Sequence, residues 1–389
     1  MENTKNLTDG NYIKRTTTFI ILFFITFLLT SCFEKNSCTI VEKNGVKIFN
    51  NSNKNSKKSV NFKPQLVRII NKDQNSNNYL SHFDLDAIGL DSYNNIFIAD
   101  MGNEAKVNKY DKNGNFIKRF VQRGSGPGEV SRISFLCTKN DTVYIGDLGT
   151  GSISIFDTNG NYIDKINPKG YLFQVKAVGN NKFTGDVFSS EIVGKKSVLC
   201  RKTLLMNNRF EMLKELDKNY MSNGENADLQ DEFLHLSVAK DKIYLAVNNK
   251  NRYEVKAFNF EGTHIETIHK SYSAIKFSKE EIKKMNLYLK KVYGDRKLNE
   301  KNVDKKFAIA GVYSDKNSNL IVQPSVDTNN DTNYGLKLDY YQNNECLGST
   351  TIPTKEPYFA CDYNILIRFM GDYMYMMDGT ENTLNIYKY

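Results

Sequence analysis

The sequence predicts an all-β fold, a six-bladed β-propeller. Three observations predict it: segments that recur at one spacing, tight-turn dipeptides between short apolar runs, and a final unit that lacks a strand. The chain has 389 residues, 40% of them hydrophobic, enough for one large domain or two small ones. That composition excludes a largely disordered or fibrous protein. We expect the ring over residues 64–389, with an N-terminal strand that closes the last blade and one inserted helix.

The repeat is clearest in two pairs of segments. Ile96–Asp100 returns as Val143–Asp147, about 47 residues later. Tyr110–Ile117 returns as Phe156–Ile163 after about 46 residues. Each unit is interpreted as four strands. The second strand, such as Ile96–Ala99, is apolar on both faces, which is typical of a sheet packed between two neighbours.

Turn residues and strand number extend the pattern around a ring. Asn-Gly dipeptides at 113–114 and 159–160 predict tight hairpins with positive φ angles. Three weaker units follow, and a last unit ends at Tyr389 after three strands. The strand at Gln65–Ile70, which has no partner before the first repeat, is predicted to supply the missing fourth. The alternative is a pair of β-sandwiches or another repeat of sheets.

One segment, at about residues 276–300, interrupts the strands with a helical pattern. Ser278 and Glu281 have the spacing of a capping box. One face carries the apolar residues Ile282, Met285, Leu289 and Val292. We expect this face to pack against the rim of the ring; the alternative is a helix that docks a partner or a membrane surface. The basic residues that keep this alternative open are Lys283, Lys284, Lys290 and Lys291.

The N-terminal segment, residues 1–31, is interpreted as a lipoprotein signal peptide. Its apolar run, Phe19–Leu29, is about eleven residues long, whereas a spanning helix needs about twenty. The sequence Leu-Thr-Ser before Cys32 resembles the bacterial lipobox, in which the Cys thiol becomes the site of lipid attachment. An ordinary secretory signal is the alternative. Residues 32–63 then form a tether with a short hairpin at Asn44-Gly45.

The segments IFIAD, KYDKNGNFI and RGSGPGEV, between Ile96 and Val130, resemble the NHL-like and TolB-like six-bladed β-propeller lipoproteins of bacteria. The resemblance covers roughly residues 39–170. Arg123 and the run Gly126–Glu129 fit the family turn, whereas Ser125 departs from it. The resemblance implies the fold and a lipid anchor in the bacterial cell envelope, with the outer membrane as the expected location. It implies little about activity, because the family is largely without assigned biochemistry.

Charge and residue counts exclude several kinds of site. The formal net charge is +9, but basic and acidic residues are interspersed, so nucleic-acid binding is not indicated. The six Cys show no CxxC spacing and the four His show no HxxxH spacing, which argues against zinc. We expect mostly free, buried thiols, with Cys346 and Cys361 the pair nearest in sequence. No GxSxG motif is present.

The candidate site follows from the topology of a propeller, in which loops between second and third strands and loops between blades leave on one face. The predicted ligand-binding residues are Asp100, Asn103, Arg123, Glu129, Asp147, Asn249, Arg252, Asp378 and Glu381. The equivalent residues Asp100 and Asp147 could bind a divalent cation or act as acid and base; alternatively, they accept backbone hydrogen bonds in turns. The Gly-rich turn 124–128 is interpreted as a connection between blades rather than a phosphate cradle.

Two functions remain after this reasoning. The first is a membrane-anchored, exported lipoprotein, expected to be monomeric, whose propeller is a non-catalytic scaffold for a ligand, protein or glycan. The second is an extracytoplasmic hydrolase or lyase that acts on a glycan or peptide through carboxylates at the channel mouth, with or without a divalent metal. No organic cofactor is predicted.

Overall fold

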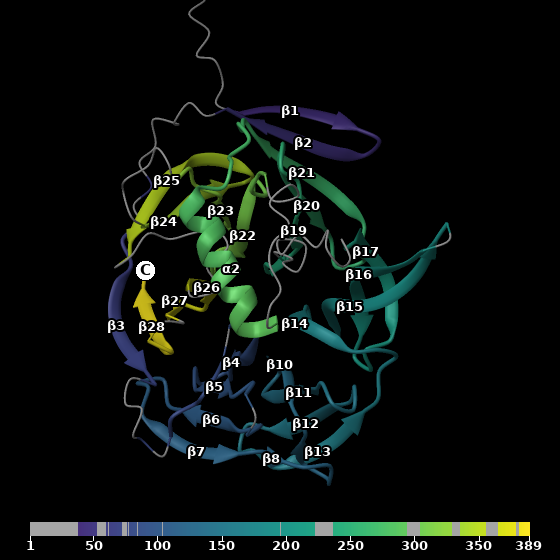
Figure 1. Cartoon of the computed structure of the whole chain (residues 1–389), viewed down its shortest axis with the longest axis vertical. Helices are drawn as coiled ribbons and strands as arrows, with labels where there is room; N and C mark the ends of the chain where they lie inside the picture. Colours follow the sequence, from purple (N-terminus) through teal and green to yellow (C-terminus); the bar gives the residue numbers. More distant parts are fainter. Residues whose placement is uncertain are drawn as a thin grey trace, which may run out of the picture.

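The chain forms six sheets arranged around a common centre, seen down the short axis of the molecule in Figure 1. A computed structural model describes residues 38–52, 60, 62–71, 76, 78–83, 85–102, 104–194, 196–221, 236–293, 304–328, 335–354, 365–378 and 381–389. Within these residues six sheets have four or more strands each, and a small additional sheet has two. The predicted six-bladed β-propeller is therefore confirmed.

The first three blades follow one another along the chain. Blade 1 contains β4 (Ile88–Leu90), β5 (Ile96–Ala99), β6 (Val107–Tyr110) and β7 (Phe116–Phe120), preceded by the 3-10 helix η1 (Leu85–Ala87). Blade 2 contains β10 (Ile133–Lys139), β11 (Thr142–Asp147), β12 (Ile153–Asp157) and β13 (Tyr162–Ile166), preceded by the short strands β8 (Gln122–Arg123) and β9 (Glu129–Val130). Blade 3 contains β14 (Leu172–Val178), β15 (Lys182–Val193), β16 (Lys196–Asn207) and β17 (Met212–Tyr220).

The remaining blades include the first described strands, the C-terminal strands and the helix. Blade 4 contains β18 (Leu236–Val238), β19 (Ile243–Ala246), β20 (Tyr253–Phe258) and β21 (His264–Lys270), extended by β2 (Val46–Asn51) and β1 (Cys38–Lys43). Helix α2 (Lys279–Tyr293) leads to blade 5, which contains β22 (Ile309–Ser314), β23 (Leu320–Pro324), β24 (Gly335–Gln342) and β25 (Glu345–Pro353). Blade 6 contains β26 (Ile365–Met370), β27 (Tyr373–Asp378), β28 (Thr383–Lys388) and β3 (Gln65–Ile70).

The last blade joins a strand from the N-terminal part of the chain to the three C-terminal strands. Strand β3 pairs antiparallel with β28, with Ile70 opposite Leu384 and Arg68 opposite Ile386. The prediction that an N-terminal strand completes the last blade is confirmed. This pairing supplies the strand that the C-terminal segment lacks, so the ring closes through strand hydrogen bonds.

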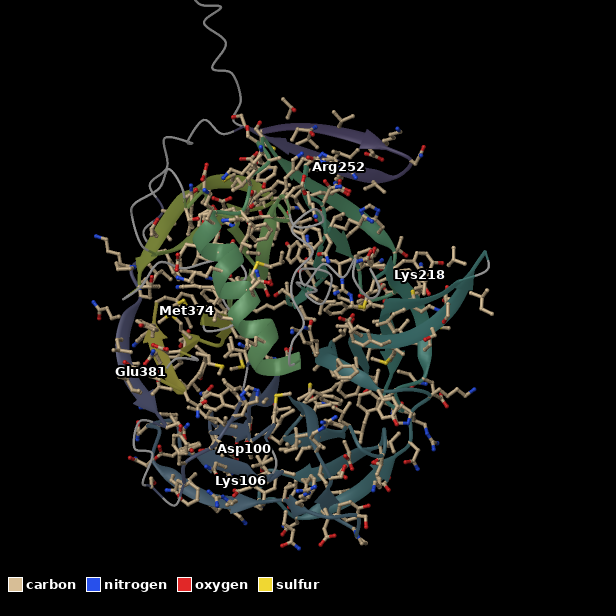
Figure 2. All side chains as sticks on the ribbon, viewed as in Figure 1. Asp100, Lys106, Lys218, Arg252, Met374 and Glu381 are labelled. Carbon is tan, nitrogen blue, oxygen red and sulfur yellow. The ribbon has the colours of Figure 1, made fainter. Side chains whose placement is uncertain are left out.

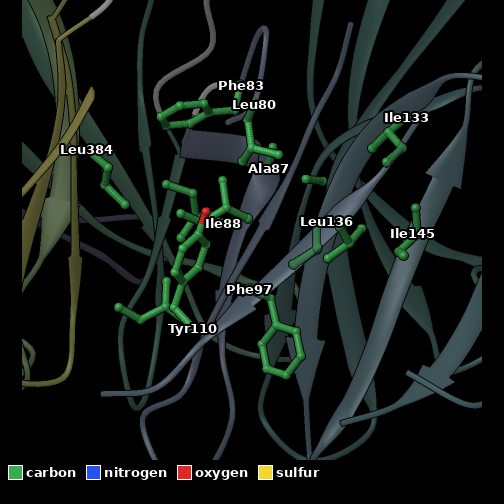
Figure 3. Packing of buried hydrophobic residues seen from close by; sticks show 14 of the residues in the cluster. Leu80, Phe83, Ala87, Ile88, Phe97, Tyr110, Ile133, Leu136, Ile145 and Leu384 are labelled. Carbon is green, nitrogen blue, oxygen red and sulfur yellow. The ribbon is translucent and has the colours of Figure 1, made fainter. Parts of the chain in front are cut away.

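The core lies between the faces of neighbouring blades. Figure 3 shows one cluster in which Ile88 and Phe97 of blade 1 lie between Leu384 of blade 6 and Ile145 of blade 2. All four residues of β5 are buried, as the two-sided apolar pattern predicted. Each blade thus buries both faces of its second strand, which explains the short continuous apolar runs in the sequence.

Lysine side chains connect the first four blades on the side opposite the inter-blade loops. Lys109 of blade 1 donates to the Thr158 carbonyl of blade 2 at 2.8 Å. Lys139 of blade 2 donates to the Lys182 carbonyl of blade 3 at 2.9 Å. The Lys182 ammonium group donates in turn to the Phe260 carbonyl of blade 4 at 2.7 Å. The hairpin turns on this side therefore have a second role, because their backbone carbonyls accept hydrogen bonds from lysine ammonium groups of the preceding blade.

The Asn-Gly turns differ from the predicted two-residue form. Gly114 has a φ of 79°, but Asn113 is not among the residues with positive φ. The Asp111 carboxylate accepts the backbone N–H groups of Asn113 and Asn115, each at 2.8 Å. The Asp111 side chain organises a longer turn. This turn needs one residue with positive φ, the glycine, whereas the predicted two-residue turn needs positive φ at both of its central residues.

The N-terminal hairpin is part of the ring rather than a separate tether. Its Asn44-Gly45 turn has positive φ at both residues, as the sequence suggested. Strand β2, however, pairs in parallel with β21 and buries Phe49. Asn51 donates to the carbonyls of His269 and Asn344, each at 3.1 Å. Local patterns could not reveal this docking because the partners lie more than two hundred residues away.

Helix α2 begins with the predicted capping box. The Ser278 N–H donates to the Glu281 carboxylate at 2.8 Å, and the Glu281 N–H donates to the Ser278 hydroxyl at 3.2 Å. Met285 is buried, as expected for the apolar face. The side chains of Leu289 and Val292 lie outside the described residues. Among the described helices, none has the length and apolarity to cross a membrane.

Four cysteines lie within the described part of the chain, and all are free and buried. They are Cys38, Cys137, Cys200 and Cys346. This agrees with the expectation of mostly free thiols. Cys32 and Cys361 fall outside the described residues, so the Cys346–Cys361 pairing stays untested.

Candidate binding face

One face of the ring carries the loops between second and third strands, the connections between blades and helix α2. We call it the loop face. This arrangement follows from antiparallel order, because a chain that leaves the outer strand of one blade on this side enters the inner strand of the next. In Figure 1, α2 crosses in front of the centre of the ring. The helix is part of the connection from β21 to β22, so it belongs to the loop face.

Asp100 lies at the end of β5 and is fully buried. Its carboxylate accepts hydrogen bonds from the Ser81 N–H at 2.7 Å and from the Ser81 hydroxyl at 3.0 Å. It also accepts the Gly102 N–H at 2.9 Å, and the Lys106 ammonium group lies 3.7 Å away. These bonds fasten the connection that enters blade 1 to the loop after β5.

Asp147 occupies the equivalent position in blade 2 and has the same kind of partners. Its carboxylate accepts the Ser131 hydroxyl, the Gly149 N–H at 2.9 Å and the Thr150 hydroxyl at 2.9 Å. Burial raises the pKa of Asp147, but the hydrogen bonds outweigh burial and leave the pKa below its ordinary value. The bonds at both aspartates are those of turn acceptors, the second of the two interpretations given above.

The Gly-rich turn before blade 2 is built around the Glu129 carboxylate. The Gly126 N–H donates to it at 2.8 Å and the Gln122 side chain at 2.9 Å, and these bonds lower the pKa of Glu129. A Cβ atom on Gly124 would lie 2.0 Å from a Glu129 oxygen, so glycine leaves room for the carboxylate. Arg123 is exposed in β8, which pairs with β9. This geometry is that of a connection between blades.

The other predicted residues lie on separate blades. The Asn249 side chain accepts the N–H groups of Asn251 and Arg252, each at 2.8 Å, and Arg252 lies 3.5 Å from Glu254. Asp378 accepts the N–H of Glu381 at 3.1 Å. Asn103 falls outside the described residues.

The labelled positions show how widely the predicted residues are distributed. Figure 2 places Arg252 on the far side of the ring from Asp100 and Glu381. Asp100 and Glu381 lie on adjacent blades, where the Asn382 side chain donates to the Ser81 carbonyl at 3.3 Å and the Ser81 N–H donates to Asp100. The predicted residues that the structure describes thus do not converge on one point.

A charged group nearer the centre of the ring was missed by the sequence reasoning. Asp86 in η1 and Lys176 in β14 form an ion pair at 3.5 Å, although they come from blades 1 and 3. Arg368 in β26 donates to the Leu85 and Ile88 carbonyls at 2.8 and 2.9 Å. We call Asp86, Lys176 and Arg368 the central charged cluster.

Electrostatics and strand order place this cluster among the inner strands. Burial raises the pKa of Cys137 in β10, and the positive charges of Arg368 and Lys176 oppose that rise. The side chains of Lys176 and Asp86 are 18% and 27% exposed, so both remain accessible to solvent. Single charges inside apolar inner strands, as in LFQVKAV and ILIRFM, are the signal that could have identified the cluster.

Asp186 lies behind the central charged cluster, in the second strand of blade 3. It is buried, and the Thr203 hydroxyl donates to it at 2.8 Å. Burial raises the pKa of Asp186 to about 6, opposed by the positive charge of Arg201 and by the Thr203 bond. Lys176 lowers this pKa and Asp86 raises it, so both are within electrostatic range.

The chemistry that this face offers is charge recognition. An ammonium group and a guanidinium group on inner strands, with a carboxylate on the 3-10 helix η1, can bind an anionic or zwitterionic group. Among the described residues, no three His, Cys, Asp or Glu side chains are arranged to hold a metal ion.

Comparisons with known proteins find similarity at the level of three-dimensional structure. A protein of Bacteroides fragilis that is described as exported is 10% identical to this chain, with a TM-score of 0.47. The match covers 87% of this chain and 98% of the Bacteroides fragilis protein. A member of the DUF4221 family from Bacteroides vulgatus is 11% identical, with coverages of 84% and 97% and a TM-score of 0.48. A gluconolactonase from Xanthomonas campestris is 8% identical, with coverages of 78% and 85% and a TM-score of 0.41.

No family model and no curated protein matches the sequence. At such identities and TM-scores, the structural similarities carry no argument about activity.

Proposed function

We propose that the protein is an exported lipoprotein, anchored in the cell envelope through Cys32, whose propeller is a scaffold that binds a ligand, protein or glycan. The anchor is supported by the sequence Leu-Thr-Ser-Cys after an apolar run that is too short to span a bilayer. Acyl chains hold a folded domain at a membrane without a spanning helix, at about 0.8 kcal/mol per buried CH₂ group.

We also propose membership of the NHL-like and TolB-like propeller lipoproteins. The support is the segment RGSGPGEV, whose Glu129 carboxylate organises the turn between blades 1 and 2. The six-bladed ring is compatible with this family. Family membership does not specify a partner.

A binding role is favoured over catalysis by one observation. The two best-placed carboxylates of the loop face, Asp100 and Asp147, are buried and accept several hydrogen bonds from their own loops. A carboxylate held in this way has little capacity left for a metal or a transferred proton. At the centre of the ring the central charged cluster offers accessible charges, and Lys176 and Asp86 there can recognise a partner without chemistry.

The anchor is tested by labelling cells with radioactive palmitate and fractionating their membranes. We expect label and membrane association in the natural chain, and loss of both in Cys32→Ser. Label that persists in Cys32→Ser would overturn the attachment site.

The binding role is tested by metal analysis and by photo-crosslinking. A photoreactive residue at Glu104, exposed in the loop between β5 and β6 on the loop face, is compared with one at Asn113, exposed in a turn on the opposite face. We expect a discrete adduct from position 104 and none from position 113. Adducts from position 113 alone would favour binding on the opposite face. A stoichiometric divalent metal that is lost in Asp147→Asn would favour the hydrolase alternative.

A further inference from the structure

We propose that the outer edge of blade 4, formed by β1, lies on the membrane surface, so that the ring stands edge-on to the bilayer. This inference rests on the proposed lipid attachment at Cys32. Its partner is a lipid surface, contacted by the apolar side chains of β1 and by the basic residues of the hairpin turn.

The length of chain after the anchor restricts the distance. Cys38, the first residue of β1, is the sixth residue after Cys32. Six extended residues span at most about 22 Å. Strand β1 is therefore held near the membrane whenever Cys32 carries lipid, whereas other strands are constrained only through the ring.

The surface of β1 suits such a contact. It is the edge strand of a six-stranded sheet, and Ile40 and Val41 are 56% and 53% exposed. Neighbouring residues of a strand point to opposite faces, so apolar side chains project on both sides of this edge. Soluble proteins usually protect an exposed edge strand with charged residues or proline. Two adjacent exposed apolar residues on such an edge therefore favour a contact with an apolar surface. Lys43 and Lys47 flank the turn and are exposed, so they can meet phosphate head groups. Glu42, opposite Lys47 in the register, is the one acidic residue of the hairpin.

The hairpin is fixed firmly enough to orient the whole ring. Strand β2 pairs with β21 from Lys47 opposite Glu266 to Asn51 opposite Lys270. The Asn51 side chain also accepts the Cys346 N–H of blade 5 at 2.8 Å. An orientation imposed on β1 is therefore transmitted to blades 4 and 5.

Figure 1 shows the consequence for the rest of the molecule. Strand β1 lies at one rim, and β7 and β13 lie at the opposite rim. With β1 on the bilayer, blades 1 and 2 point away from it. The loop face and the face opposite both stay open to partners.

The test uses the absence of Trp from the sequence, because a single introduced Trp is then an unambiguous fluorophore. Val41→Trp is compared with Ile163→Trp, a matched control on the outer strand of blade 2 that is 56% exposed. Each full-length lipoprotein, purified from bacteria that lipidate it, is reconstituted in phosphatidylglycerol-containing vesicles with and without brominated acyl chains. Bromine quenches only fluorophores at the depth of the lipid interface, so we expect about twofold quenching for Val41→Trp and none for Ile163→Trp.

The outcomes separate the orientation from the anchor. Protein that floats with the vesicles while Val41→Trp and the second variant Ile40→Trp stay unquenched would overturn the orientation and leave the anchor intact. Quenching of Ile163→Trp as strong as that of Val41→Trp would also overturn it. A blue shift of Val41→Trp emission without quenching would indicate a second copy of the chain on this edge instead. Failure to float would overturn the lipid anchor and this inference with it.

Discussion

Lys306 and Glu281 form an ion pair in which neither side chain is exposed to solvent. Glu281 belongs to the first turn of α2, and its carboxylate also accepts the Ser278 N–H. The Lys306 ammonium group donates in addition to the Val326 carbonyl, in the loop after β23, at 2.8 Å. The helix is therefore attached to blade 5 by a buried charge pair.

Lys306→Met should destabilise the protein strongly. Removal of one partner leaves a buried carboxylate without its counter-ion, which costs about 3–5 kcal/mol in the free energy of unfolding. The double variant Lys306→Met with Glu281→Leu should recover much of this loss, because no uncompensated charge remains. Equilibrium denaturation of the three proteins measures both effects. A double variant no more stable than the single one would contradict the buried-charge explanation.

Asp147→Ala should also act on stability. It leaves the N–H and the hydroxyl of Ser131 without their acceptor at the entrance to blade 2, at a cost of about 2–4 kcal/mol. The comparison is Asp111→Ala, which removes a similar turn acceptor from an exposed turn where water can replace it. Urea unfolding should show the larger loss at Asp147. Equal losses would mean that burial of the loop contributes little.

The fold was predictable because its main features repeat locally. The return of Ile96–Asp100 as Val143–Asp147 and the unpaired strand Gln65–Ile70 indicated the blades and the closing strand. The docking of β2 on β21 was not predictable, since a parallel pairing between distant segments leaves no period in the sequence. The turn at Asn113 was misjudged because the carboxylate of Asp111 lengthened it.

The site was harder to predict than the fold. Topology correctly placed Asp100 and Asp147 in equivalent loops, but sequence could not show how many hydrogen bonds each accepts. The ion pair of Asp86 with Lys176 joins blades 1 and 3, which are not adjacent in the ring. Such a contact depends on ring closure, which a single blade motif does not contain.

A double-mutant cycle should test the turn before blade 2. Gly124→Ala places a methyl group where the Glu129 carboxylate lies, so we expect a loss of about 1–2 kcal/mol. In a Glu129→Ala background the methyl group meets no carboxylate and should cost less. Thermal unfolding of the four proteins gives the coupling energy, expected to be about 1 kcal/mol. Additive effects would show that the close approach of Gly124 and Glu129 does not determine stability.

Asp186→Asn should change how stability depends on pH. Burial raises the pKa of Asp186 from 3.8 to about 6 in the folded protein. The folded protein therefore holds the Asp186 proton more tightly than the unfolded chain does. The resulting contribution to the free energy of unfolding is fully present below about pH 4 and is lost as the pH rises through about 6.

The variant has no proton to lose and can still accept the Thr203 hydroxyl. Its stability relative to the natural chain should rise by about 2–3 kcal/mol between pH 4 and pH 7, since each pKa unit corresponds to about 1.4 kcal/mol. The substitution also removes a negative charge near Arg201, which changes the free energy of unfolding by an amount that does not depend on pH, because the guanidinium stays charged at both pH values. This amount cancels when the values at pH 4 and pH 7 are subtracted. Denaturation of both proteins at pH 4, 5, 6 and 7 measures the difference, and a difference that does not vary with pH would show that Asp186 titrates normally.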